Sequence, residues 1–252
     1  YNQIRCLLED RRVLFSGTPC QVAGVKNFLG KDSDNLLYVD LVCHGVGSPG
    51  VFQKYIEYLE KTHDSKLESF SFRNKKIRFG KMLEYVTMAE FENGDTIENE
   101  KDPYNSAFLQ ALIIRPSCGN CKFANIGRVG DITLADFKRK HELLPQAREL
   151  NNFSTVIINS SKGREVWERL HEFMTIYPVD LNDVVRTNSP LRMPSRLNRN
   201  REAFFRELWT TDDVDMALRR YMSTPPLYRK IWMSLPDRLR GTIKRTLVVR
   251  EG

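Results

Sequence analysis

The first sixty residues repeat one pattern twice: a short apolar run, a loop, and then apolar residues at helical spacing. The apolar runs at 12–16 and 36–42 each predict a short buried strand. The segments 19–29 and 49–59 that follow them carry apolar side chains three or four positions apart, as one face of a helix requires. Strand, loop and helix in this order predict a parallel α/β sheet, in which ligands collect at the carboxyl ends of the strands.

A different pattern occupies residues 68 to 98. Polar and apolar residues alternate over 68–73 in the manner of a half-buried strand. The β-prone runs 85–91 and 96–98 flank Asn93-Gly94, which is a strong hairpin signal. The sequence therefore predicts a β-hairpin region inserted after the two opening βα units.

Helices and two further strands are predicted after the hairpin. Asp102-Pro103 is a typical helix start, residues 131–136 and 154–159 have the pattern of strands, and a serine at 160 or 161 caps the next helix. Beyond about residue 180 we expect short helices interrupted by prolines. The fold class predicted is α/β: a parallel sheet built from βα units, an inserted β-hairpin region and a helical C-terminal tail.

The composition is that of a soluble folded chain, with 41% hydrophobic and 28% charged residues among 252. No apolar run approaches the length of about eighteen residues that spans a bilayer. The chain begins with Tyr1, shows no recognisable signal peptide and has an odd number of cysteines. We therefore expect a reducing, cytoplasmic location and a chain cut from a longer protein.

The excess positive charge is concentrated at the C-terminus. Nine basic and two acidic residues lie within 219–252, a difference equal to the net charge of +7 of the whole chain. Trp232, Leu235, Leu239 and Ile243 recur at helical intervals, which predicts a helix with one apolar stripe and a cationic remainder. Such a helix suits weak peripheral contact with an anionic inner-membrane surface or docking on a partner. The alternative is that it packs on the protein's own core; no nucleic-acid partner is predicted.

Four of the five cysteines lie in three short polar or glycine-rich segments. Cys20 follows Gly17-Thr18-Pro19, Cys43 precedes His44-Gly45, and Cys118 and Cys121 form a Cys-x-x-Cys pair. Four thiolates from separate loops match the coordination number of a cubane iron–sulfur cluster or a structural zinc. The spacing leaves the metal open, with reduced, unligated thiols as the alternative. Cys6 falls in an apolar stretch, and we interpret it as a small buried hydrophobe.

Two further features bear on chemistry. Gly17 precedes a predicted helix, whose free N–H groups suit the pyrophosphate of a flavin, although a tight turn alone also explains this glycine. His44 is either a ligand or proton donor, or a histidine held by structural hydrogen bonds, and we favour the second interpretation. Asp131 and Asp136 are expected to make turn and cap hydrogen bonds. No serine lies in the Gly-x-Ser-x-Gly elbow of a hydrolase.

Several separate motifs occur in an order that identifies a family. They are Phe15 to Gly24, Asp40 to Gly45, Phe72 to Lys75, Arg115 to Cys121, Asp131 to Phe137 and, more loosely, Asn159 to Gly163. In these segments the chain resembles the C-terminal domain of the coenzyme F420 hydrogenase/dehydrogenase beta subunit family. The resemblance covers about residues 1–210, which we expect to form one domain, and leaves 211–252 as the basic helical tail.

The resemblance implies an oxidoreductase subunit that passes electrons between FAD, a 4Fe-4S cluster and a deazaflavin such as coenzyme F420 or another redox partner. By position, it implies one set of cluster ligands: Cys20, Cys43, Cys118 and Cys121. The predicted flavin contacts are Gly17, Thr18 and Gln21, with Arg73 or Arg115 facing the phosphates. It also implies an upstream ferredoxin-like region or a redox partner protein as the electron-transfer partner.

One departure from the family pattern bears on the flavin. Members commonly have aspartate, phenylalanine, tryptophan and glycine where this chain has Asp136-Phe137-Lys138-Arg139. Bacterial members without the deazaflavin also occur, often alongside polysaccharide-assembly proteins. The alternative function is therefore a non-catalytic scaffold with a structural zinc or an empty four-cysteine site, associated with polysaccharide assembly.

Overall fold

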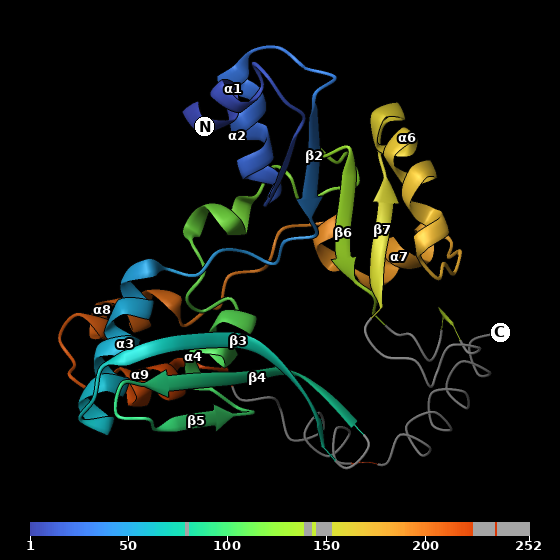
Figure 1. Ribbon diagram of the computed structural model, residues 1–252. Helices are drawn as coiled ribbons and strands as arrows, with labels where there is room; N and C mark the ends of the chain where they lie inside the picture. Colours follow the sequence, from blue (N-terminus) through green and yellow to red (C-terminus); the bar gives the residue numbers. More distant parts are fainter. Residues whose placement is uncertain (79–80, 139–142, 145–152, 224–234, 236–252) are drawn as a thin grey trace.

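The computed structural model describes residues 1–78, 81–138, 143–144, 153–223 and 235. Within them the chain forms two separate sheets, each with its own helices (Figure 1). One sheet has the strand order β1-β2-β6-β7, and the other has the order β3-β4-β5. The mixed α/β fold predicted from the sequence is confirmed.

The first sheet carries the two opening βα units. Strands β1, β2 and β6 are parallel neighbours, and the small core beneath them is formed with helix α2, around Val22, Val25, Leu36 and Tyr38. Gly30 ends α2 in the left-handed conformation, with φ of 69°. The elements are α1 (Asn2–Leu7), β1 (Val13–Gly17), α2 (Pro19–Leu29), β2 (Leu36–Leu41), β6 (Ile132–Asp136) and β7 (Ser154–Ile158).

Two details of this region differ from the sequence prediction. Strand β7 runs antiparallel to β6, with Asp136 opposite Ser154, so the sheet is mixed rather than wholly parallel. Apolar runs alone do not reveal strand direction, because parallel and antiparallel strands share the same side-chain period. Cys6 is exposed rather than buried, because α1 packs against the sheet through Ile4 and leaves the side containing Cys6 in solvent.

The second sheet is the inserted hairpin region, and its antiparallel strands cover the larger hydrophobic core. Gly94 adopts φ of 88° in the turn between β4 and β5, which confirms the Asn93-Gly94 hairpin. Helices α3, α4, α8 and α9 lie against this sheet (Figure 1) and complete the core, in which Phe91 and Phe204 are buried. The elements are α3 (Pro49–His63), β3 (Leu67–Arg78), β4 (Lys81–Phe91), β5 (Thr96–Asn99), α4 (Pro103–Leu109), α8 (Arg201–Leu208) and α9 (Val214–Tyr221).

The predicted helix caps are confirmed. The Asp102 carboxylate accepts a hydrogen bond from the N–H of Asn105 at 2.7 Å, and the Ser160 hydroxyl accepts one from Gly163 at 3.0 Å. The remaining elements are the 3-10 helices η1 (Pro116–Asn120), η3 (His171–Phe173) and η4 (Ser189–Leu191), and the α-helices α6 (Ser161–Leu170) and α7 (Leu181–Thr187).

The C-terminal region is only partly described. Helix α9, which falls inside the predicted tail 211–252, packs against α4 and α8 through Val214, Ala217 and Leu218. The amphipathic stripe predicted from Trp232 onward lies outside the described residues, apart from Leu235. Among the helices in the described part of the chain, none has the length and apolar character needed to cross a bilayer.

Candidate functional site

The four candidate cysteines lie in three segments: the start of α2, the loop after β2, and the 3-10 helix η1 with the residue that follows it. Cys20 is the second residue of α2, directly after β1, and Cys43 lies two residues beyond the end of β2. Because β1 and β2 are parallel and in register at Gly17 and Asp40, these two loops leave the same edge of the sheet. Cys118 lies within the 3-10 helix η1 and Cys121 directly after it.

Backbone pairing joins the Cys43 loop to the segment before Cys118. The N–H of Arg115 donates to the carbonyl of Val46 at 2.8 Å, and the N–H of Ser48 donates to the carbonyl of Ile113 at 2.8 Å. The N–H of Val46 also points at the sulfur of Cys118, with N and Sγ 3.4 Å apart. This short pairing therefore places Cys118 against the loop that follows Cys43.

Two glycines allow the loops to approach each other and their neighbours. Gly45 has φ of 150°, and a Cβ there would meet the side chain of Ile114 at 3.1 Å. A Cβ at Gly119, between the paired cysteines, would lie 2.6 Å from Cγ of Leu197. The Cys-x-x-Cys loop is thus covered closely by the segment before α8, and a larger residue at Gly119 would push this cover away.

The thiols share one electrostatic neighbourhood around Cys43. Cys20 is exposed, whereas Cys43, Cys118 and Cys121 are partly buried. Burial raises the pKa of the Cys43 thiol, and charge on Cys118, Cys20 and Cys121 raises it further. Among the residues that the structure describes, no three His, Cys, Asp or Glu side chains are arranged as they stand to hold a metal ion. The donor set has the chemistry of a four-thiolate centre, but its side chains must draw closer to bind one.

His44 is held by structural hydrogen bonds, as favoured from the sequence. Its Nε2 lies 3.1 Å from the carbonyl oxygen of Phe108, and its Nδ1 lies 3.3 Å from the hydroxyl of Ser195, which also donates to the His44 carbonyl. The ring packs edge-on against Phe108, with centroids 5.2 Å apart. Both nitrogens therefore serve to anchor the Cys43 loop to α4 and to the 195–198 segment.

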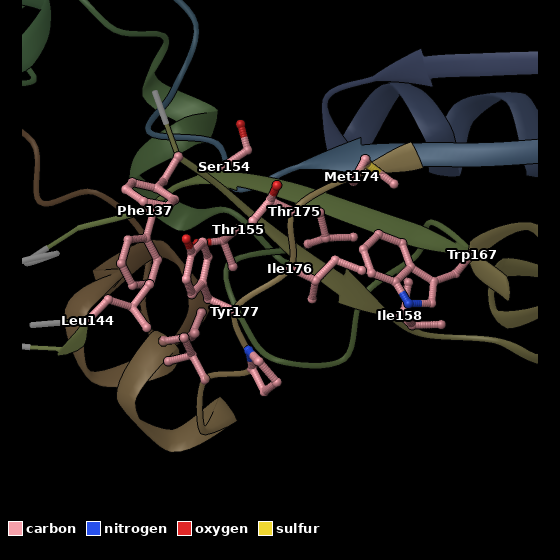
Figure 2. A pocket seen from close by; sticks show the side chains of 15 residues that line it. Phe137, Leu144, Ser154, Thr155, Ile158, Trp167, Met174, Thr175, Ile176 and Tyr177 are labelled. Carbon is pink, nitrogen blue, oxygen red and sulfur yellow. The ribbon is translucent and has the colours of Figure 1, made fainter. Parts of the chain in front are cut away.

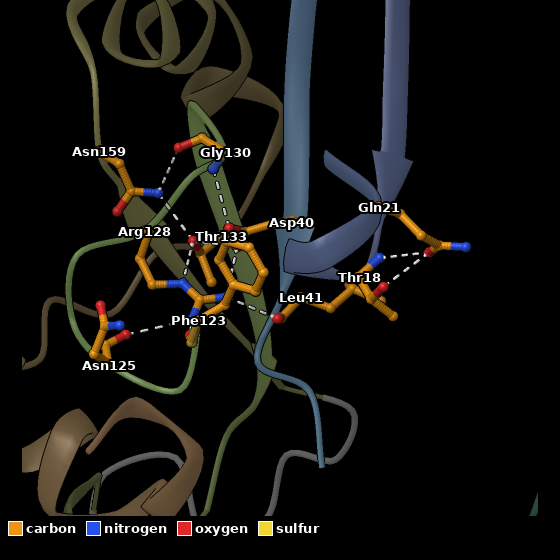
Figure 3. A network of polar contacts seen from close by, with 10 residues as sticks. All are labelled: Thr18, Gln21, Asp40, Leu41, Phe123, Asn125, Arg128, Gly130, Thr133 and Asn159. Atoms are coloured by element: carbon orange, nitrogen blue, oxygen red, sulfur yellow. Dashed lines mark hydrogen bonds and ion pairs between the residues drawn. The ribbon is translucent and has the colours of Figure 1, made fainter. Parts of the chain in front are cut away.

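A buried ion pair, Arg128 with Asp40, holds the end of β2 against the loop that follows Cys121. The side chains of Arg128 and Asp40 are 2% and 0% exposed, and Arg128 Nη2 donates to Asp40 Oδ1 at 2.9 Å (Figure 3). The same guanidinium donates to the carbonyls of Leu41 at 2.8 Å and Phe123 at 3.1 Å. Arg128 thus joins the end of β2, two residues before Cys43, to the loop that follows Cys121.

Further polar groups complete this network. The Thr133 hydroxyl donates to Asp40 Oδ1 at 2.6 Å, and the N–H of Gly130 donates to Asp40 Oδ2 at 3.0 Å (Figure 3). The Asn159 side chain donates to both the Thr133 hydroxyl and the Gly130 carbonyl. Each oxygen of the buried Asp40 carboxylate therefore has a partner, as a buried charge requires.

Sequence reasoning missed the role of this network. From the sequence, Arg128 is one of several cations that we expect to be solvated. Asp40 is noted only as the first residue of the motif Asp40 to Gly45, with no role assigned to its carboxylate. The available signal is the position of Asp40 as a charged residue inside the apolar run 36–42. A carboxylate in a buried strand predicts a buried cationic partner, although it does not identify which cation.

Three of the predicted flavin contacts lie together at the start of α2. Gly17 ends β1, Thr18 is the N-cap of α2, and Gln21 Oε1 accepts hydrogen bonds from the N–H of Thr18 at 2.9 Å and from its hydroxyl at 3.0 Å (Figure 3). This reciprocal cap uses the Gln21 oxygen, and Pro19 supplies no N–H at the first helical position. A flavin phosphate at this point would have to share these groups with the cap.

The two predicted arginines occupy different places. Arg115 starts η1 beside the Cys118 loop. Arg73 lies on β3 of the second sheet, where it donates to Asp136 at 3.1 Å and stacks over the ring of Tyr85 at 5.2 Å. The turn and cap roles expected of Asp131 and Asp136 are wrong. Asp131 accepts long-range hydrogen bonds from the N–H of Tyr38 and the hydroxyl of Ser160, and Asp136 pairs with Arg73. Arg115 thus lies beside the Cys118 loop, whereas Arg73 lies at the carboxyl end of β6, the parallel neighbour of β2, and the flavin contacts stay a prediction.

Comparison with known proteins identifies a family. The model that describes the C terminus of the coenzyme F420 hydrogenase/dehydrogenase beta subunit matches residues 10–183. A search of curated proteins found no match. The matched range runs from β1 into the start of α7 and contains all four loop cysteines.

Proposed function

The chain belongs to the family formed by the C-terminal part of coenzyme F420 hydrogenase/dehydrogenase beta subunits, and from that premise we propose that it is an electron-transferring oxidoreductase subunit with a four-cysteine iron–sulfur centre. The family supports a redox role of the beta-subunit type. The observation that carries the proposal is how the loops meet. The Cys20 and Cys43 loops leave the same edge of the sheet, and the N–H of Val46, in the Cys43 loop, lies 3.4 Å from the sulfur of Cys118.

In this proposal Cys20, Cys43, Cys118 and Cys121 hold one 4Fe-4S cluster. The cluster would supply one-electron transfer. Arg128 and His44 are positioning residues, because they fix the loops without offering a free ligand atom. Cys20 is exposed at the start of α2, and its sulfur lies 3.2 Å from the Thr18 hydroxyl oxygen. In this proposal its thiol turns from that contact toward the other three cysteines.

Metal and sulfide analysis tests the cluster directly. We expect the anaerobically purified full chain to contain iron and acid-labile sulfide, and Cys43→Ala to lose most of both. Cys6→Ala is the matched control, because Cys6 is exposed on α1 and lies outside the three loops. Retention of iron by Cys43→Ala at the wild-type level, or zinc in place of iron, would contradict the iron–sulfur assignment.

FAD is proposed as the second cofactor, close to Gly17, Thr18 and Gln21 and with Arg115 facing its phosphates. The support is the family together with the N-terminus of α2 at the same sheet edge as the cysteines. Titration with FAD should give saturable quenching that Arg115→Ala weakens and that the distant Arg11→Ala leaves unchanged. Absence of saturable quenching by the anaerobically reconstituted chain would remove the flavin from the proposal. The electron acceptor proposed is coenzyme F420 or another redox partner, with an upstream ferredoxin-like region as partner.

The alternative function is a non-catalytic scaffold in which the same thiols bind structural zinc or remain free, in association with polysaccharide assembly. One observation favours its free-thiol form: no three of the described candidate ligands are arranged to hold a metal as they stand. Metal content and colour separate the two functions, since zinc gives a colourless protein and an iron–sulfur cluster a brown one.

A further inference from the structure

The segment that leads into α8 covers the cysteine loops. This cover segment, residues 195–201, runs from the region of α7, beside the first sheet, to the start of α8, against the second (Figure 1). Its Leu197 packs on Gly119, between the paired cysteines. The cover segment lies beyond residues 10–183, which the family model matches. Its contribution to the cysteine centre therefore lies outside the motifs that identify the family.

Arg201, the last residue of the cover segment, is fixed against the chain that follows α4. Its Nη1 donates to the carbonyl of Leu112 at 2.8 Å, and its guanidinium carbon lies 4.4 Å from the centroid of the Phe205 ring. The N–H of Asn198 donates to the carbonyl of Ala111 at 3.2 Å, and the N–H of Arg201 donates to the carbonyl of Asn198 at 3.1 Å. These contacts fix both the backbone of the cover segment and the direction of the Arg201 side chain.

The positive charge of Arg201 acts on Cys118. Burial lowers the pKa of the Arg201 guanidinium, and negative charge on Cys118 opposes this shift. Such an effect implies that the two groups lie close together, since the interaction between charges falls with distance. The N–H of Val46 lies 3.4 Å from the same sulfur. The surroundings of Cys118 thus contain both a hydrogen-bond donor and a cation.

A metal centre held by four thiolates carries an excess of negative charge. Cysteine sulfurs that bind a metal are deprotonated. Four of them leave two negative charges uncompensated around one zinc ion, and the same excess around the oxidised core of a 4Fe-4S cluster. A cation beside the centre stabilises the metal-bound form, because charge is screened less in partly buried loops than in bulk water.

We propose that Arg201 is the charge-compensating residue of the four-cysteine centre. The inference rests on that centre, which is part of the function proposed above, and it applies to iron–sulfur and to zinc alike. Arg201 donates no metal ligand. It acts as a positioning residue through Cys118, whose bound thiolate its positive charge stabilises.

The cover segment is remote from the cavity of about 580 Å³ that opens beside β7, between β7, α6, α7 and the segment 174–179 (Figure 2). The described lining of this cavity extends from Phe137 to Val184 and includes no residue of the cysteine loops or of the cover segment. Substitutions in the cover segment therefore leave this edge of the first sheet unaltered.

Transfer of the bound metal to a chelator tests the proposal. The full chain is purified anaerobically and mixed with 1,10-phenanthroline, which takes up both iron and zinc and is uncharged, so that the charge of a variant does not attract or repel it. We expect Arg201→Gln to lose its metal about tenfold faster than the wild type at low salt, as loss of a partner of a metal ligand implies. Arg201→Lys, which keeps the charge, should lose it at close to the wild-type rate.

Two controls separate charge from structure. Arg199→Gln removes the same charge from an exposed residue of the cover segment and should leave the rate unchanged. In 1 M KCl the difference between Arg201→Gln and the wild type should largely disappear, because the Debye length falls to about 3 Å, whereas a loss of packing would persist. The melting temperature of each variant establishes that it is folded.

The outcomes distinguish this inference from the proposed function. Equal rates in the wild type and Arg201→Gln, or a rate in Arg201→Lys as fast as in Arg201→Gln, would overturn the role of Arg201 and leave the cysteine centre in place. A wild-type chain that holds no metal after anaerobic purification would overturn the centre and this inference together.

Discussion

At the scale of single residues, Arg128 joins the loop after β2 to the loop after Cys121. Its guanidinium is buried and bonds to Asp40 and to carbonyls on both sides of the site. Arg128→Met leaves the Asp40 carboxylate buried without its cation, so the free energy of unfolding should fall by about 3 to 5 kcal/mol. Urea denaturation measures this change.

The matched control for Arg128 is Arg11, which pairs with Asp10 on the surface, where the two side chains are 59% and 63% exposed. Arg11→Met should leave the urea unfolding midpoint close to that of the wild type, because solvent screens an exposed pair. Equal unfolding midpoints for the two variants would show that burial of the Arg128 pair contributes no stability.

Tyr38 offers a prediction for alkaline pH. Its side chain is buried, its hydroxyl has no described hydrogen-bond partner, and burial followed by the charges of Asp32 and Asp131 raises its pKa to about 12. The unfolded chain, with a pKa of about 10 at this residue, loses its proton first, so wild-type stability falls as pH rises from 10 to 12.

Tyr38→Phe removes both the unpartnered buried hydroxyl and its titration at alkaline pH. At pH 8 the variant should be as stable as the wild type or more stable by about 1 kcal/mol, because an unpartnered buried hydroxyl is lost. Between pH 8 and pH 11 its stability should fall by about 1.4 kcal/mol less than that of the wild type. Urea unfolding of both proteins at the two pH values measures the difference, and parallel losses would refute the role assigned to Tyr38.

At the scale of elements, the contact between α6 and the first sheet depends on one glycine. A Cβ at Gly163 would lie 2.3 Å from the carbonyl oxygen of Asp131, which is backbone and therefore cannot rotate away. Gly163→Ala should force α6 off the start of β6 and reduce stability by about 2 to 3 kcal/mol, as for other overpacked sites.

Gly50, in α3, is the matched control for Gly163. A Cβ there would meet only the ring edge of Trp209, at 3.2 Å, and Trp209 is 61% exposed and free to move. Gly50→Ala should therefore leave thermal stability unchanged or raise it slightly through helix propensity, by about 0.5 to 1 kcal/mol. If Gly163→Ala and Gly50→Ala have the same melting temperature, the close approach of α6 to the sheet does not limit stability.

Helix α4 is anchored to α3 through Asp102. This carboxylate caps α4 and accepts a 2.6 Å hydrogen bond from the hydroxyl of Tyr55, and burial raises its pKa. Asp102→Ala should cost about 3 kcal/mol, because the cap and the partner of a buried hydroxyl are lost together. Asp102→Asn keeps the cap through its Oδ1, and its Nδ2 donates to the Tyr55 hydroxyl in place of the oxygen that accepted from it. Without a buried charge, this variant should retain most of the stability in the same denaturation assay. Equal losses in the two variants would mean that charge, rather than hydrogen bonding, is what the site requires.

At the scale of the whole molecule, the net positive charge is carried by residues 219–252, most of which lie outside the described part of the chain. We expect the full chain to sediment weakly with anionic vesicles at low salt, and the chain ending at residue 227 to do so less. Each basic residue near such a surface contributes on the order of 1 kcal/mol. Equal pelleting of both forms, or pelleting of neither, would assign the apolar stripe to another role.

The sequence by itself determined the local elements. The two βα units, the Asn93-Gly94 hairpin and the caps at Asp102 and Ser160 were predicted because hydrophobic period, turn residues and capping side chains act over a few neighbouring positions. The same signals placed the four candidate cysteines directly after strand or helix ends. The motifs around them led to the family that the comparison confirms.

Only the tertiary structure decided which distant residues meet. Asp40 and Arg128 are 88 positions apart, and His44 and Ser195 are 151 apart, so no periodic pattern links them. The antiparallel direction of β7 and the cavity beside it depend likewise on how complete elements pack. Local sequence fixes what each segment can form, whereas the pairing of buried charges and the empty space beside a strand arise only when segments close on one another.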